Sequence, residues 1–153
     1  MKRHCFFPAL LIATTAFAAG PYDGVYQRGL SPSYTSVHQS GNTLLAIGLD
    51  TLPASGISVP TVTGQSIQLA SMDFWAYSIG TIAGNVAQMS GTTAFGGCVG
   101  SGTVVFDGAG NATSTLMSLT NTPSGASQGL NCAALLQVLI STGANVSQLR
   151  KIF

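Results

Sequence analysis

The chain has 153 residues, only 6% of them charged, and a formal net charge of +1. It has no basic patch of the kind that nucleic acid or an anionic lipid surface requires, so we expect neither partner. All four acidic residues are aspartates, and glutamate, which favours helices, is absent. This composition, rich in Gly, Ser and Thr, predicts strands and turns and argues against long helices.

The N-terminus has the organisation of a secretory signal. A basic start, Met1 to Arg3, precedes an apolar run from Cys5 to Ala13 and a small-residue stretch that includes Ala18. The alternative is an uncleaved anchor, but the apolar run is shorter than the roughly 20 residues that span a bilayer. We therefore predict a signal peptide over residues 1–18 and one domain over residues 19–153, secreted or periplasmic, without stable membrane insertion.

Short strands separated by turns follow along most of the domain. The clearest hairpin has an alternating strand, a tight turn at Ser40–Asn42 and an aliphatic strand after it. Residues 50–60, 91–97 and 121–129 are predicted loops because of their Gly, Pro and polar content. The expected strands are 24–27, 33–39, 43–49, 74–83, 86–90, 98–106 and 112–120, with one or two short strands within 61–70.

The C-terminal part has a different pattern. Asn131 is a typical N-cap, and the apolar run after it predicts a helix over 132–139. Residues 141–153 are expected to form a polar tail that ends in a last edge strand. The predicted class is thus all-β with a short C-terminal helix, and about seven or eight strands with Gly/Asn turns suit an up-and-down barrel or a sandwich.

Two cysteines remain after the predicted cleavage, Cys98 and Cys132. An even number of cysteines in an exported chain predicts a disulfide, which would attach the helix to the strand that begins at Cys98. In the chain-entropy model such a bridge stabilises the fold by about 3–4 kcal/mol. Two free thiols are the alternative.

Six short motifs are spread over most of the domain. They are Gly24-Val25-Tyr26-Gln27, Ser36-Val37-His38-Gln39-x-Gly-Asn-Thr43-Leu44, Trp75-x-Tyr77-x-x-Gly80, Gly102-Thr103-Val104-Val105-Phe106-Asp107, Asn131-Cys132-Ala133 and Arg150-Lys151-Ile152-Phe153. Together they resemble the motifs of a group of uncharacterised bacterial secreted proteins. The resemblance implies a small antiparallel, lipocalin-like (calycin-like) β-barrel. It implies no activity, so no functional residue follows from it.

Aromatic side chains are the best candidates for ligand binding. Tyr34 and His38 share one face of their strand, and Trp75 and Tyr77 share one face of theirs. If both faces point into a barrel, the four residues line a pocket for a small apolar or ring-bearing ligand. The alternative is that Trp75 and Tyr77 simply fill a narrow barrel.

The sequence offers little for catalysis or for a metal. His38 is the only histidine after the predicted signal, and no Gly-x-Ser-x-Gly motif accompanies it. The aspartates are isolated, and zinc ligands are too few. The segment from Asp107 to Asn111 is a possible calcium loop, but a turn is the simpler interpretation. We expect no catalytic residue, no metal and no cofactor.

The sequence therefore favours a non-enzymatic exported barrel that binds a small apolar ligand or a protein partner. The main alternative is a structural or surface component that self-associates through edge strands. An outer-membrane barrel and a secreted hydrolase that depends on His38 are the less favoured alternatives.

Overall fold

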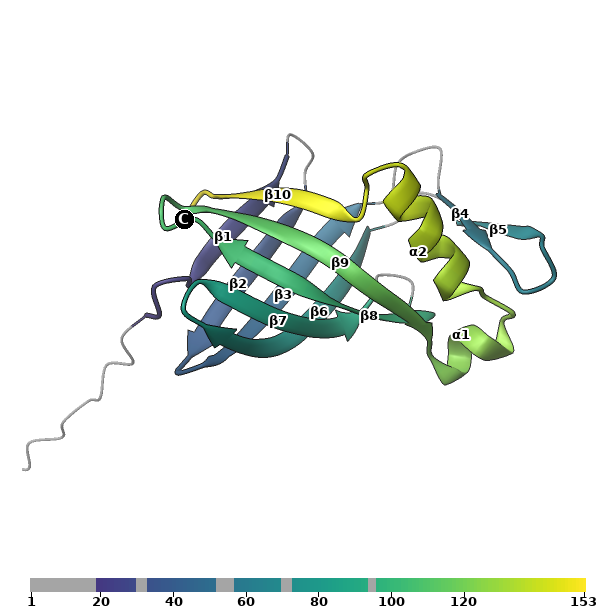
Figure 1. Cartoon of the computed structure of the whole chain (residues 1–153), viewed down its shortest axis with the longest axis horizontal. Coiled ribbons are helices and arrows are strands. Elements are labelled where there is room, and N and C mark those ends of the chain that lie inside the picture. The colour runs from purple at the N-terminus through teal and green to yellow at the C-terminus, as the bar shows by residue number, and fades with distance from the viewer. Residues whose placement is uncertain (1–18, 30–32, 52–56, 70–72, 94–95) are drawn as a thin grey trace, which may run out of the picture.

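The computed structural model describes residues 19–29, 33–51, 57–69, 73–93 and 96–153. The predicted signal peptide, residues 1–18, lies outside the described residues. Within them the molecule is mostly β-structure, with ten strands and two short helices (Figure 1).

Eight antiparallel strands form a closed barrel, which confirms the predicted barrel architecture and excludes the sandwich. Their order around the barrel is β1-β10-β9-β8-β7-β6-β3-β2. The barrel strands are β1 (Gly24–Arg28), β2 (Tyr34–Ser40), β3 (Thr43–Thr51), β6 (Asp73–Ala83), β7 (Val86–Thr92), β8 (Cys98–Phe106), β9 (Asn111–Asn121) and β10 (Val146–Lys151).

The last strand corrects one expectation. The C-terminal tail was expected to end in an edge strand, but β10 pairs with both β1 and β9. Strand β10 thereby links β1 to β9 and closes the barrel. Closure satisfies the backbone groups that an edge strand would leave unpaired.

Two further differences concern the predicted loops. Strand β4 (Ile57–Pro60) lies inside the segment expected to be a loop, and it pairs with β5 (Ser66–Leu69) in a separate two-stranded sheet. Helix α1 (Pro123–Ser127) lies inside residues 121–129, which were also predicted to be a loop. It forms because the Thr122 side chain accepts a hydrogen bond from the Gly125 N–H, while proline suits the first turn.

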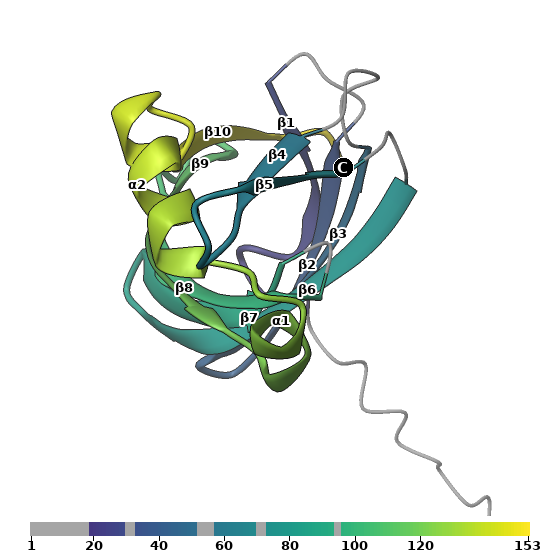
Figure 2. The same cartoon turned by 90° about the vertical axis from the view of Figure 1, so that its right-hand side faces the viewer.

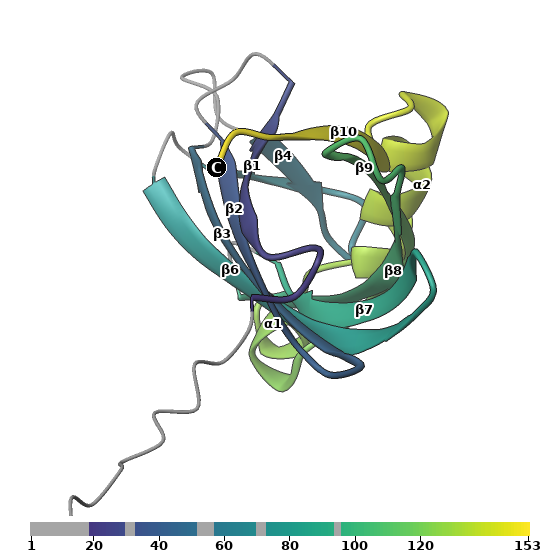
Figure 3. The same cartoon turned by 90° about the vertical axis from the view of Figure 1, so that its left-hand side faces the viewer.

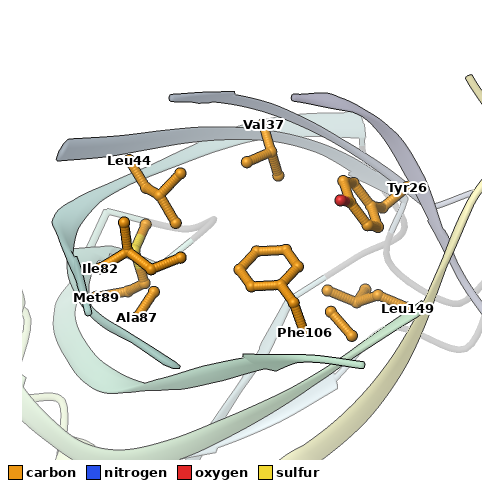
Figure 4. Packing of buried hydrophobic residues seen from close by; sticks show 9 residues of the cluster. Tyr26, Val37, Leu44, Ile82, Ala87, Met89, Phe106 and Leu149 are labelled. Carbon is orange, nitrogen blue, oxygen red and sulfur yellow. The ribbon is translucent and has the colours of Figure 1, made fainter. Parts of the chain in front are cut away.

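One end of the barrel is closed by aromatic packing, and we call it the packed end. Tyr22, from the segment before β1, stacks on Phe106 with ring centroids 4.2 Å apart. The Tyr26 hydroxyl donates a hydrogen bond to the Tyr22 carbonyl at 2.9 Å. Figure 3 views the barrel from this end, where the N-terminal segment crosses the opening. Figure 4 shows buried side chains pointing inward from opposite walls: Tyr26, Val37, Leu44, Ile82, Ala87, Met89, Phe106 and Leu149.

Helix α2 (Cys132–Ser141) and the β4–β5 hairpin lie at the opposite end, and we call them the cap (Figure 2). The Asn131 side chain accepts a hydrogen bond from the Ala134 N–H at 3.0 Å, which confirms the predicted N-cap. A second apolar cluster holds the cap to β8 and β9, and its buried members are Val59, Cys98, Leu119, Leu130, Cys132, Leu135 and Leu136.

The two cysteines lie at disulfide distance within this cluster. The Cα atoms of Cys98 and Cys132 are 5.9 Å apart, and both side chains are fully buried. The bridge links the first residue of β8 to the first residue of α2, as the sequence predicts. It therefore ties the cap covalently to the barrel wall.

Candidate functional site: a cavity in the barrel

A cavity of about 250 Å³ lies inside the barrel. Its lining includes members of the packed end, such as Tyr26 and Phe106, and also Leu116, which packs against the cap cluster. The cavity therefore extends from the packed end toward the cap. An apolar cavity of about 150 Å³ is large enough to bind benzene, so this volume suits a body of roughly ten non-hydrogen atoms.

The cavity exists because several inward positions carry small side chains. The neighbouring strands β3 and β6 contribute Gly48, Ala76 and Ser78. In a closed barrel of eight strands the interior is just wide enough for side chains to fill it. Small residues at these positions therefore leave space that larger ones would occupy.

The lining combines apolar and hydroxyl-bearing side chains. Val37, Leu44 and Met89 are buried members of the packed end and also line the cavity. Thr35 and Ser114 add hydroxyl groups farther along. This distribution provides an apolar surface for a ligand together with a few polar groups that can orient it, the usual composition of a small-molecule site.

One charged residue joins the lining among the residues that the structure describes. Arg28 is the last residue of β1 and lies two positions beyond Tyr26, so both side chains fall on the same face of the strand. Tyr26 is 2% exposed, whereas Arg28 is exposed to solvent. Arg28 therefore lies where the cavity meets solvent, a place that we call the rim.

Tyr26 has a raised pKa in the cavity lining. Burial raises the pKa of its hydroxyl, and the negative charge of the nearby Asp23 raises it further. The Asp23 carboxylate is itself held by backbone N–H groups, since it accepts hydrogen bonds from Gly20 and Gln39. Tyr26 is thus a neutral structural element at the base of the cavity.

The structure brings the four predicted ligand residues onto one region of the wall, strands β2 and β6 joined by β3. Tyr34 pairs with Leu49, which pairs with Trp75. Tyr34 and His38 are exposed and alternate with the buried Val37, so they lie on the outer face and do not line the cavity. The Trp75 side chain is outside the described part of the molecule.

Tyr77 borders the cavity but is 56% exposed. Its strand neighbours Ala76 and Ser78 hold the inward positions instead. The signal that identifies the cavity wall is thus the run of small residues that alternates with Tyr77, and sequence reasoning that followed the aromatic residues missed it.

The structure also shows the surroundings of His38, the candidate catalytic residue, and of Asp107, in the candidate calcium loop. The His38 ring lies 3.2 Å from the Ser36 hydroxyl on the outer face, and no carboxylate hydrogen-bonds to that ring among the described residues. Asp107 accepts hydrogen bonds from the Ala109 and Asn111 N–H groups and from the Asn111 side chain. These bonds lower the Asp107 pKa and account for the segment as a turn.

No group of three or more His, Cys, Asp or Glu side chains is arranged to hold a metal ion in the described ranges. No helix in that part of the chain is long and apolar enough to cross a membrane. Comparison of the whole chain with family models, curated proteins and solved structures finds no match.

Proposed function

We propose that this protein is an exported, lipocalin-like barrel that binds a small, mainly apolar molecule in its cavity. The observation that carries the proposal is the space that Gly48, Ala76 and Ser78 leave above a well-packed apolar base. Export is supported by the signal-like N-terminus and by the Cys98–Cys132 pair, since disulfides persist in oxidising compartments.

A cavity-filling substitution tests the proposal. A Cβ atom added at Gly48 meets nothing closer than 3.8 Å, so Gly48→Leu places its side chain in the cavity without a backbone clash. The probe is 2-naphthol, a neutral ten-carbon ring system whose fluorescence changes in an apolar environment. We expect saturable binding to the wild-type protein and at least about tenfold weaker binding to Gly48→Leu.

The matched control is Gln88→Leu. Gln88 is exposed and alternates with the buried Ala87 and Met89, so its leucine is added on the outer face of β7. This variant should bind 2-naphthol as the wild type does. Equal binding by wild type and Gly48→Leu, with both proteins folded, would place the probe elsewhere and refute the proposal.

Self-association is the second candidate, and an exposed apolar surface on the barrel favours it. The surface lies on the outer face of β3 and β6 and includes Leu49, Tyr77 and Ile79, which are 38%, 56% and 53% exposed. The barrel strands are paired on both sides, so association through the barrel would use this face rather than a barrel strand edge. Sedimentation velocity of the wild type and of Ile79→Ser tests it, and a concentration-independent monomer would refute it.

A further inference from the structure

Arg28 distinguishes the rim of the cavity from the rest of its lining. It is the one charged residue among the described residues that line the cavity. Its backbone N–H donates to the Ser33 carbonyl at 2.9 Å, which continues the ladder between β1 and β2 up to the rim. The end of β1 thus holds the backbone of Arg28 beside the opening, and the guanidinium is near solvent.

The chemistry of this side chain favours an oxyanion. A guanidinium carries five N–H donors in a fixed planar arrangement that matches a carboxylate. It can therefore bind a ligand oxygen while it keeps a partner within the protein. A charge-assisted hydrogen bond of this kind is about twice as strong as a neutral one.

Recognition at the rim depends on direct contact between one guanidinium and one anionic group, since Arg28 is the one charged residue among the described residues that line the cavity.

We propose that the ligand is a small molecule with an apolar body and a single carboxylate, its body in the cavity and its carboxylate on Arg28. This inference rests on the proposed function and specifies its ligand class. The apolar base around Phe106 and Leu44 takes the hydrocarbon end, so the ligand enters with that end first. The charged group stays at the rim, where water still solvates it and the cost of burial is small.

The test compares two ligands of the same shape, octanoate and octanamide, by displacement of 2-naphthol. In wild-type protein octanoate should bind about tenfold more tightly than octanamide because of the charged contact. Arg28→Gln should remove this preference by weakening octanoate alone. Arg28→Lys should retain part of it, since an ammonium is a point charge without the planar fork.

Arg150→Gln is the matched control. Arg150 is an exposed arginine on the neighbouring strand β10, and it does not line the cavity. The preference for octanoate should persist in this variant. If octanamide and octanoate displace 2-naphthol equally from the wild type, the inference fails while the proposed function stands. If 2-naphthol itself does not bind to the wild type, the proposed function fails.

A measurement on the wild-type protein alone avoids any folding defect of the variants. The carboxyl signal of octanoate labelled with ¹³C at C1 is titrated with pH in the free and bound states. Contact with Arg28 should lower the pKa of the bound carboxyl below its value in water. A bound pKa equal to or above the free value would overturn the inference.

Discussion

The two ends of the barrel are built from the same strands but differ in the size of their inward side chains. At the packed end Tyr26, Leu44 and Phe106 belong to one buried apolar cluster, which forms the base of the cavity. Toward the cap, β3 and β6 carry Gly48 and Ala76 instead, and a cavity remains. The comparison shows how one closed sheet supplies a rigid core at one end and a ligand-sized space at the other.

The largest expected effect comes from opening the packed end. Phe106 is 3% exposed and stacks on Tyr22, so Phe106→Ala should lower the free energy of unfolding by about 3–5 kcal/mol. Urea denaturation measures this loss. Val105→Ala is the control: Val105 is 40% exposed and should cost less than about 1 kcal/mol. Equal losses would show that the packed end does not dominate stability.

Removal of the disulfide probes the other end. The bridge closes a loop with a sequence separation of 34, so Cys98→Ala with Cys132→Ala should cost about 3–4 kcal/mol. Hydrogen exchange should rise first in α2, because this helix packs mainly on β9 and β4 beside the bridge. A uniform rise at both ends would contradict the view that the cap is a separate unit.

The next largest effect on stability is expected from alanine substitutions at two glycines, Gly102 and Gly48, which should change stability in opposite directions. A Cβ atom at Gly102 would lie 2.1 Å from the Thr115 carbonyl oxygen, so Gly102→Ala should destabilise by about 1–3 kcal/mol. At Gly48 the nearest atom is 3.8 Å away, and Gly48→Ala should stabilise by about 0.4–1 kcal/mol. Thermal unfolding compares the two. A large loss at Gly48 would mean that the cavity wall lacks the space we describe.

The smallest effect concerns Tyr26 and pH. Its pKa is raised in the folded state, so its contribution is complete below about pH 10 and is lost as pH rises through the folded pKa. Tyr26→Phe should cost about 1 kcal/mol at pH 7, since the hydrogen bond to Tyr22 is lost, and should flatten the alkaline decline. Stability curves from pH 7 to 12 measure both.

Tyr34→Phe serves as the control for that curve. Tyr34 lies on the outer face, and the variant retains Tyr26, so the alkaline decline should remain. If the loss of stability at alkaline pH were unchanged in Tyr26→Phe, that loss would come from the titration of another group.

Much of the fold follows from local patterns in the sequence. The strand over residues 98–106 has the predicted bounds, and the hairpin around Ser40–Asn42 and the N-cap at Asn131 are also confirmed. Each depends on residues close together in the chain, such as a turn or a capping side chain. Strand β4 was missed because its pairing with β5 and the burial of Val59 against α2 outweigh the Gly and Pro around it.

The sequence by itself determined which residues alternate along each strand and which cysteines can pair. It did not determine which face of β2 and β6 points inward, because alternation defines two faces without assigning either to the core. Closure of the barrel made that assignment: β10 joins β1 to β9, and the register places Val37, Ala76 and Ser78 inside and Tyr34 and His38 outside. The cavity is therefore a property of the tertiary structure, since it arises where small side chains from separate strands meet.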